Sequence, residues 1–178
     1  LMDIPGIKPR TNNSKSIQIN RGQEVVFGNA PLGETRLSIG LTKKLPKQGL
    51  SLTQFSVNDG QFEFDFVEFG TGYLVGRSRS NFTLLPKKGI NLPRSIYDEA
   101  QQYEIYKSYI KGIEDLNLDG LGLSFVQTGQ LVDQLRKLVP SLVLISKVEN
   151  SEGLRNCIDI IKQSDAIMID RGDLGAEI

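Results

Sequence analysis

The chain has 178 residues, of which 39% are hydrophobic and 24% charged, a balance ordinary for a water-soluble globular protein of one domain or slightly more. Its 21 lysines and arginines equal its 21 aspartates and glutamates, so no net charge attracts it to nucleic acid or to an anionic membrane. No stretch approaches the roughly 20 apolar residues that span a bilayer, and we expect a cytoplasmic protein.

The sequence contains no histidine and one cysteine. This composition excludes an internal disulfide framework, most zinc sites and every histidine-based nucleophilic triad. Acid, base or ligand chemistry must therefore come from carboxylates, lysine, arginine, tyrosine and hydroxyl groups, which favours hard cations such as Mg²⁺. Because the first residue is Leu1 and not methionine, we expect a fragment of a longer protein.

Residues 16–92 carry the alternating pattern of β-strands. The segments SIQINRGQEVVF, LSLTQFSV, QFEFDFVEF and GYLVGRS alternate apolar and polar residues, most clearly at residues 62–66. Hairpin turns are predicted at residues 58–60 (Asn-Asp-Gly) and 70–72 (Gly-Thr-Gly). Several short strands at this spacing predict a small barrel or sandwich.

After residue 92, helices alternate with short apolar strands. Apolar residues between Ile96 and Ile113 fall at helical spacing, with Ser95 and Asp98 as an expected capping box, and Thr128 opens a second helix. The expected strands are residues 121–126, 142–146 and 166–169. The apolar residues expected on the second and third helices are Leu131, Leu135 and Leu138, then Leu154, Cys157, Ile158 and Ile161. This β-α-β-α-β order predicts a parallel sheet covered by helices.

Polar residues follow two of these strands. Lys147 and Glu149 lie two apart at the end of one strand, so their side chains project to the same side. Asp173 and two glycines follow the next strand, and glycine backbones allow close approach to an anion. Function gathers at the carboxyl ends of parallel strands, where this set would suit a divalent cation and an anionic substrate. A plain surface ion pair between Lys147 and Glu149 is the alternative.

The segment ISKVENSEGLRNCIDIIKQSDAIMIDRGDLGAEI resembles the active-site segment of the pyruvate kinase family, with its K-[IV]-E-N-x-E-G and R-G-D-L-G-x-E motifs at the family spacing. VNDG, KKGINLP and LSFV resemble further family motifs in family order, and MDIPGIKPRT does so more loosely. The resemblance implies an α/β fold, a partial (β/α)8 TIM barrel with an inserted small β-barrel lid domain. Barrel strand three would occupy residues 1–11, the lid 12–92, and the barrel segment with the active site 93–178.

The resemblance also implies roles for individual residues. Lys147 matches the catalytic lysine, which contacts the transferred phosphoryl group and stabilises the developing enolate. Glu149 and Asp173 match the two carboxylates that hold Mg²⁺ or Mn²⁺. The backbone around Arg171, Gly172 and Asp173 matches the loop that receives the substrate carboxylate.

On the nucleotide side, Arg10, Asp59 and Lys88 match positions near the ADP or ATP phosphates, although Asp59 is equally explained by its hairpin turn. Asp3 matches a ligand of a monovalent cation. The family's adjacent threonine, a K⁺ ligand, is Ile4 here, and isoleucine offers no oxygen, which argues against the K⁺ site. An acid at position 170, usually a small residue, either alters metal affinity or turns away.

The resemblance thus implies phosphoryl transfer from phosphoenolpyruvate to ADP, in a protein whose full-length form is a homo-oligomer, a tetramer in the family. Family residues that bind phosphate, cation and substrate would lie before Leu1 and after Ile178, so we expect the 178 residues alone to be inactive. Two alternatives remain open. One is a divergent, non-catalytic homologue that binds metal or ligand in a regulatory role. The other is a related (β/α)8 enzyme that acts on another enolate.

Overall fold

The computed structural model describes residues 1–47, 52–113 and 115–178. The chain divides into two compact units, one of residues 1–7 and 94–178 and one of residues 8–93. We call them the parallel-sheet unit and the β-rich unit. The first holds a parallel sheet with helices and the second a mainly antiparallel sheet, so the predicted α/β class is confirmed.

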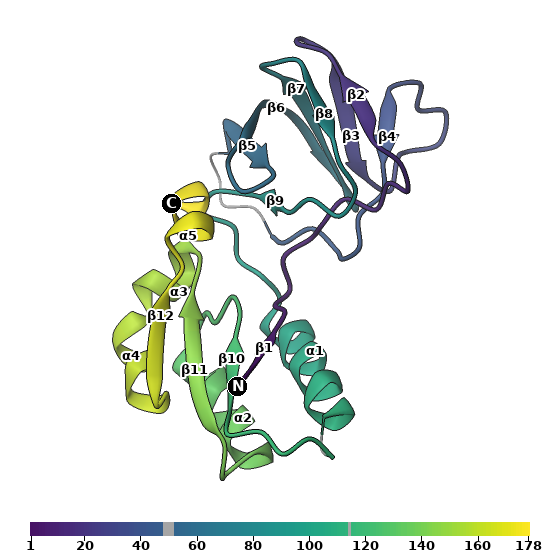
Figure 1. Cartoon of the computed structure of the whole chain (residues 1–178). Coiled ribbons are helices and arrows are strands. Elements are labelled where there is room, and N and C mark those ends of the chain that lie inside the picture. The colour runs from purple at the N-terminus through teal and green to yellow at the C-terminus, as the bar shows by residue number, and fades with distance from the viewer. Residues whose placement is uncertain (48–51, 114) are drawn as a thin grey trace. The chain divides into compact units, whose positions relative to one another are not determined.

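The parallel-sheet unit is built on a four-stranded parallel sheet of order β1-β10-β11-β12 (Figure 1). Its strands are β1 (Met2–Ile4), β10 (Gly120–Leu123), β11 (Val143–Val148) and β12 (Ala166–Ile169). Its helices are α1 (Glu99–Gly112), α2 (Gly129–Leu138), α3 (Ser151–Arg155), α4 (Cys157–Gln163) and α5 (Arg171–Glu177). Helices α1, α2 and α4 pack side by side and share one hydrophobic core with the strands.

Helix starts follow local capping chemistry. The Thr128 side chain accepts a hydrogen bond from Leu131 N, so Thr128 is the N-cap of α2, as predicted. The expected capping box at Ser95 is wrong, because α1 begins at Glu99 with Asp98 as its N-cap and Ser95 is buried before the helix. The strand predicted over residues 121–126 ends at Leu123. Two residues later, Phe125 has a positive φ, and this left-handed backbone conformation cannot continue a strand.

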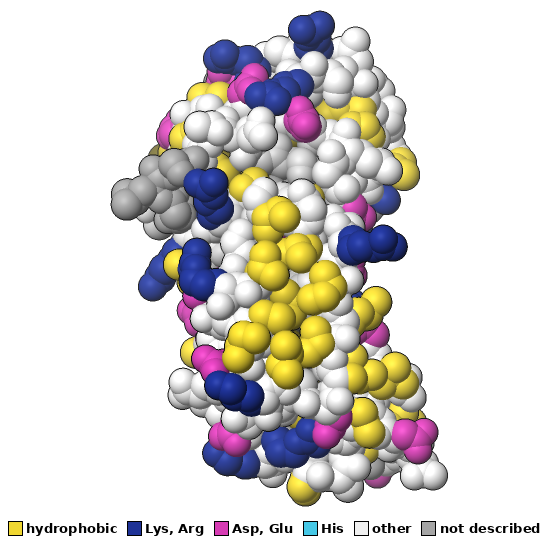
Figure 2. All heavy atoms as spheres, turned by 90° about the vertical axis from the view of Figure 1, so that its left-hand side faces the viewer, with side chains coloured by type: hydrophobic (Ala, Val, Ile, Leu, Met, Phe, Trp, Pro, Cys, Tyr) yellow, Lys and Arg dark blue, Asp and Glu magenta, His cyan; other side chains and the backbone are white. Residues whose placement is uncertain are grey.

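The single helix expected around Leu154 and Ile161 is wrong. It is divided into α3 and α4 at Asn156, whose side-chain amide donates to Gln127 O and Glu152 Oε1. Ile160 points into the core. The large apolar residues exposed on α3, α4 and β12 are Leu154, Ile158, Ile161, Met168 and Ile169. Figure 2 shows hydrophobic side chains gathered on the side of the molecule where β12 and α4 lie.

The β-rich unit contains a six-stranded sheet of order β4-β3-β7-β6-β5-β9 and a β2-β8 pair. Its strands are β2 (Ile17–Ile19), β3 (Glu24–Gly28), β4 (Leu37–Ile39), β5 (Gln54–Val57), β6 (Phe62–Gly70), β7 (Tyr73–Ser78), β8 (Phe82–Leu84) and β9 (Ile90–Asn91). The first two residues of the segment LSLTQFSV, 50 and 51, lie outside the described residues, and β5 forms its last four.

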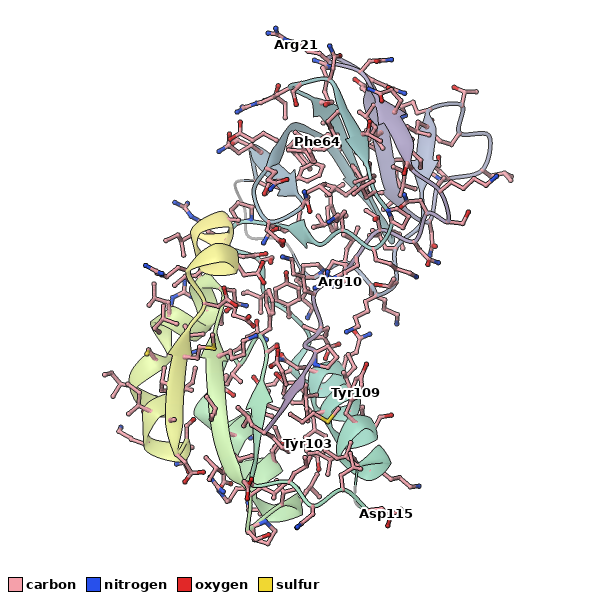
Figure 3. The ribbon with its side chains drawn as sticks, in the orientation of Figure 1. Arg10, Arg21, Phe64, Tyr103, Tyr109 and Asp115 are labelled. Carbon is pink, nitrogen blue, oxygen red and sulfur yellow. The ribbon has the colours of Figure 1, made fainter. Side chains whose placement is uncertain are left out.

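Both predicted hairpins are present in the β-rich unit. The turn between β5 and β6 has positive φ at Asn58, Asp59 and Gly60, and the turn between β6 and β7 has it at Gly72. Phe64, labelled in Figure 3, is fully buried and packs with Phe27 and Phe55 in the core of this unit. In the described part of the chain, no helix is both long enough and apolar enough to cross a bilayer.

Candidate functional site

Strand register brings several polar side chains to the carboxyl end of the parallel sheet. Lys147 on β11 pairs with Met168 on β12, and the next pair joins Val148 to Ile169, so Glu149 and Asp170 follow adjacent strand ends. The backbone N of Asp170 donates to Val148 O at 3.3 Å, which keeps the two strand ends together. The prediction that the strands before Lys147 and before Asp170 end next to each other is confirmed.

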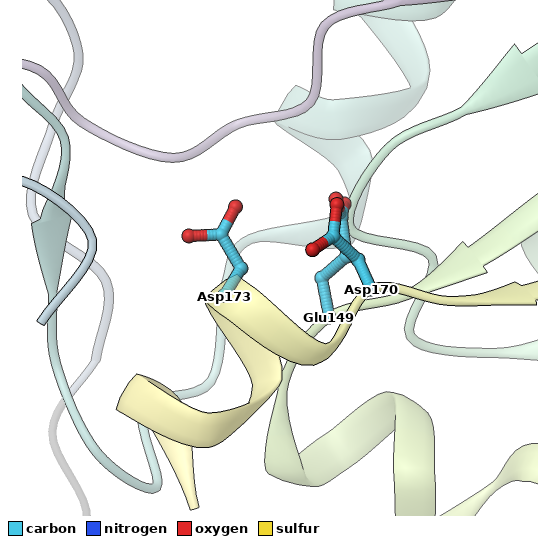
Figure 4. A group of neighbouring side chains, drawn as sticks. All are labelled: Glu149, Asp170 and Asp173. Atoms are coloured by element: carbon cyan, nitrogen blue, oxygen red, sulfur yellow. The ribbon is translucent and has the colours of Figure 1, made fainter.

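Three carboxylates converge there. Glu149, Asp170 and Asp173 can each place one carboxylate oxygen within 4.8 Å of the others. Figure 4 shows Glu149 and Asp170 with their carboxylates close together, and Asp173 projecting from α5 beside them. Because oxygen ligands are those that Mg²⁺ and Mn²⁺ prefer, these residues fit a divalent metal.

The Lys147 ammonium sits among acids. Its Nζ lies 3.2 Å from Glu149 Oε1, 3.3 Å from Asp3 Oδ2 and 3.8 Å from Asp170 Oδ2, and the side chain is only 12% exposed. Burial alone would lower the pKa of Lys147, but the charges of Glu149 and Asp3 outweigh burial and raise that pKa above its ordinary value. Lys147 is therefore held as a cation. Its burial distinguishes it from a plain surface ion pair.

Glu149 is buried, and its two carboxylate oxygens have different partners. Oε1 faces Lys147, whereas Oε2 accepts a hydrogen bond from Phe125 N at 2.5 Å. Burial raises the pKa of Glu149 to about 7, even though Lys147 and the Phe125 N–H act in the opposite direction. The carboxyl thus loses its proton near neutral pH, where a metal ion can compete with that proton.

The Asp170 carboxylate is turned into the site and not away from it. Its Oδ2 lies 3.8 Å from Lys147 Nζ, and its Oδ1 accepts a hydrogen bond from Gly172 N at 3.2 Å, which makes Asp170 the N-cap of α5. The expected loop at residues 171–173 is wrong, because these residues form the first turn of α5. The Asp170 cap explains why residues 171–173 form a helical turn and not a loop, since it satisfies a backbone amide of that turn.

The motif KVENSEG fixes the backbone that follows Glu149. Asn150 is buried and caps α3, because its Oδ1 accepts a hydrogen bond from Gly153 N at 2.8 Å. A Cβ on Gly153 would lie 2.4 Å from Val126 O, so only glycine fits there without a shift. The cap and the glycine hold the chain that follows Glu149 against the end of β10.

The remaining expected site residues fall into both units. Asp3 lies beside Lys147, whereas Ile4 is fully buried on β1. Arg10, Asp59 and Lys88 all belong to the β-rich unit.

Local contacts of these three residues differ. Arg10 Nη1 donates to Lys87 O at 3.2 Å, and Lys88 N donates to Thr11 Oγ1 at 3.0 Å. Asp59 lies in the β5–β6 turn and forms an ion pair with Lys8 at 3.3 Å.

Ser124 was not predicted as a site residue. Its Oγ lies 3.3 Å from Lys147 Nζ and 3.4 Å from Asp3 Oδ1, so it joins the lysine to the first strand. Its position directly after β10, at the carboxyl end of a parallel strand, was the signal that could have identified it.

Comparison with known proteins identifies the family. The family described as "Pyruvate kinase, barrel domain" matches residues 1–178. "Pyruvate kinase, cytosolic isozyme" of Nicotiana tabacum is 31% identical over 191 residues, covering 100% of this chain and 37% of that protein. "Pyruvate kinase" of Clostridium perfringens is 32% identical over 189 residues, covering 100% of this chain and 40% of that protein.

A further relative, "Pyruvate kinase" of Borreliella burgdorferi, is 29% identical over 189 residues and is covered over 39% of its length. The chain therefore spans about two fifths of the length of the curated relatives that it matches. Since the family match includes every residue, the chain belongs to the pyruvate kinase family, a family of phosphotransferases.

Proposed function

We propose that this chain carries the phosphoryl-transfer site of a pyruvate kinase, which converts phosphoenolpyruvate and ADP to pyruvate and ATP. The observation that carries the proposal is the mostly shielded ammonium of Lys147 at the ends of parallel strands, within 4 Å of Glu149, Asp3 and Asp170. Phosphoryl transfer requires positioned charge more than covalent chemistry from the protein, and this arrangement provides positioned charge.

The residues that would hold Mg²⁺ or Mn²⁺ are Glu149 and Asp173, and we propose Asp170 as a third ligand. The support is that all three can place an oxygen within 4.8 Å of one another. When bound, the metal supplies positive charge to the phosphoryl and enolate oxygens.

Lys147 is proposed to contact the transferred phosphoryl group and to neutralise charge as the enolate develops. Its raised pKa supports this role, because a permanently protonated ammonium is suited to binding an anion and not to removing a proton. The first turn of α5, with Arg171 and Gly172, is proposed to receive the substrate carboxylate. Since Gly172 N already donates to Asp170 Oδ1, the substrate must compete with Asp170 for that amide.

We further propose that the parallel-sheet unit is part of a (β/α)8 barrel and that the β-rich unit is its inserted lid domain. The approximate parts are residues 1–11, 12–92 and 93–178. The parallel β1-β10-β11-β12 order and the division of the chain near residues 7 and 93 support this assignment. Arg10, Asp59 and Lys88 of the β-rich unit are the proposed nucleotide-binding residues.

The test is pyruvate formation from phosphoenolpyruvate and ADP by the longest natural chain that contains these residues, with and without Mg²⁺. Lys147→Met should lose turnover by several orders of magnitude. Lys162→Met is the matched control, because Lys162 is exposed on α4 and pairs only with Asp159 among the described ion pairs. Metal-dependent turnover that Lys147→Met loses and Lys162→Met keeps is the expected result.

A non-catalytic homologue that binds metal is the second candidate. Two observations favour it: Ile4 is buried where the family has an oxygen ligand, and Asp170 adds a negative charge beside Lys147. Bound Mg²⁺ in a folded protein without any turnover would contradict the kinase proposal and support this candidate.

A further inference from the structure

Phe125 has an unusual backbone conformation next to Glu149. Its φ is 63°, in the left-handed region that residues with a Cβ seldom adopt, and the residue is 3% exposed. Its N–H donates the 2.5 Å hydrogen bond to Glu149 Oε2. A disfavoured conformation persists only where surrounding contacts hold it.

Two buried side chains of α1 supply such contacts. Gln102 Nε2 lies 2.6 Å from Phe125 O, 3.1 Å from Ser124 O and 2.6 Å from Tyr106 Oη. The Tyr106 hydroxyl donates to Ser124 O. Burial raises the pKa of Tyr106 far above its ordinary value, so the hydroxyl keeps its proton and remains a donor.

The geometry of one peptide group joins these contacts to Glu149. The carbonyl of Ser124 and the N–H of Phe125 belong to the same planar unit, and no described peptide bond is cis. In a trans peptide the C=O and N–H point in opposite directions. Tyr106 therefore holds one end of the 124–125 peptide and Glu149 the other. Rotation of this plane would break both hydrogen bonds, and each bond polarises the peptide in the sense that strengthens the other.

We propose that Tyr106 and Gln102 are positioning residues that fix the Glu149 carboxylate for metal binding through the 124–125 peptide. With Oε2 held by Phe125 N, Oε1 is directed to Lys147 and its neighbours. This inference rests on the proposed metal-binding function of Glu149. Neither side chain lies in the family motifs that identify the site, and both come from a helix that ends before β10 begins.

A simpler role for the pair is to satisfy buried polar groups of the core. Both roles predict a loss of stability on substitution, since Gln102 and Tyr106 are completely buried. Only the positioning role predicts that the Phe125 amide and the metal affinity change as well. The experiment must therefore separate stability from these two readouts.

The variants are Tyr106→Phe, Gln102→Met and the double variant in the longest natural chain, with Leu135→Val as control. Leu135 is buried on α2 in the same core cluster as Tyr106, so its truncation lowers stability without touching the peptide. The readouts are the melting temperature, the ¹H shift of the Phe125 amide in protein labelled with ¹⁵N-phenylalanine, and the Mn²⁺ dissociation constant. Phe125→Tyr assigns the amide resonance.

We expect Tyr106→Phe and Gln102→Met to move the Phe125 amide upfield and to weaken Mn²⁺ binding about tenfold each. The Mn²⁺ affinity of the double variant should fall by less than the product of the two single losses, because both side chains act on the same peptide segment. Leu135→Val should lower the melting temperature and leave the amide shift and the Mn²⁺ dissociation constant unchanged.

An unchanged Phe125 amide in Tyr106→Phe would overturn the inference, and so would a moved amide with unchanged Mn²⁺ affinity. Failure of the unsubstituted protein to bind Mn²⁺ is a separate result, which contradicts the proposed function. In that case the amide shift alone decides whether Tyr106 holds the 124–125 peptide.

Discussion

Lys147 Nζ lies 3.2 Å from Glu149 Oε1, and both groups are largely buried. A buried pair of this kind is costly to desolvate and contributes little net stability, whereas removing one partner leaves the other charge uncompensated. The pair is therefore better explained by chemistry than by stability. It also means that a metal ion and the ammonium share the same carboxylate, which leads to the first prediction.

Lys147→Met should bind Mn²⁺ at least as tightly as the unsubstituted protein at pH 8.5. The substitution removes a positive charge next to Glu149 and within 4 Å of Asp170, so one repulsive interaction with the metal is lost. It also raises the pKa of Glu149, so the comparison is made well above pH 7, where the proton competes least with the metal. Turnover should nevertheless fall by at least about 10³-fold, because the charge that stabilises the transferred group is gone. Electron paramagnetic resonance of free Mn²⁺ measures the binding. Parallel losses of turnover and metal affinity would instead make Lys147 a structural partner of the acids.

Asp170 should contribute separately to metal binding and to the cap of α5. Asp170→Asn removes the charge but keeps an oxygen that can accept from Gly172 N, so we expect Mn²⁺ affinity to fall about tenfold with little change in melting temperature. Asp170→Ala should lose the same affinity and also about 1 kcal/mol of stability.

The matched control for the cap is Asp98→Ala. Asp98 caps α1 by accepting from Gln101 N at 3.1 Å and is not one of the three clustered acids. Asp98→Ala should lower the free energy of unfolding by about as much as Asp170→Ala does, without any change in Mn²⁺ affinity. Tighter Mn²⁺ binding in Asp170→Asn would show that Asp170 is an excess charge and not a ligand.

Glu149 should make metal binding dependent on pH near neutrality. Its pKa of about 7 in the metal-free protein means that a proton must leave before the carboxylate can bind a metal. The Mn²⁺ dissociation constant should be flat above about pH 8 and should rise towards tenfold per pH unit as the pH falls below 7. Calorimetry in buffers of different ionisation enthalpy would measure the proton released. A dissociation constant that is unchanged between pH 5.5 and 8.5 contradicts this prediction.

The raised pKa of Glu149 makes folding stability depend on pH in the opposite direction to metal binding. Because the folded pKa of Glu149 lies above that of an exposed glutamate, the folded metal-free protein binds an extra proton between about pH 4.3 and 7. Stability is therefore gained as the pH falls through this window and lost as it rises. Glu149→Gln, which is neutral throughout, should lack this part of the pH dependence in urea unfolding, whereas Glu63→Gln on the exposed face of β6 should retain it.

How far the sequence predicts this site depends on whether the contacts are local. Lys147 and Glu149 lie on one short segment, so strand periodicity alone places their side chains together. The adjacent ends of β11 and β12 follow from the parallel β-α-β order. The loop expected at residues 171–173 came from the family resemblance, and the residues instead form the first turn of α5, which Asp170 caps.

Contacts between distant residues were beyond sequence reasoning. Gln102 and Phe125 are 23 positions apart, and no period or motif relates a helix side chain to a left-handed peptide after a strand. The direction of the Asp170 side chain depends in the same way on its cap and on Lys147. Packing among helices and strands decides such contacts, and hydrophobic pattern carries no information about them.

Gly6 lies between β1 and the turn that carries Phe125, and the space around it is closed. A Cβ at this position would lie 2.4 Å from Ser124 O and 2.9 Å from Phe125 Cβ. Gly6→Ala must therefore push residues 124–125 away, and we expect a loss of about 1–3 kcal/mol in the free energy of unfolding. Since Phe125 N and Ser124 Oγ contact Glu149 and Lys147, Mn²⁺ binding should weaken as well.

Gly112→Ala provides the control, because it makes the same change at the last residue of α1, where nothing lies within 4 Å of the added Cβ. It should raise stability by up to ~1 kcal/mol, because alanine is the better helix former, and leave Mn²⁺ binding unchanged. Denaturant unfolding and Mn²⁺ titration of the two variants measure both effects. If Gly6→Ala matched Gly112→Ala in both stability and Mn²⁺ affinity, the turn after β10 could shift without disturbing Glu149. Its close packing against Gly6 would then make no contribution to metal binding.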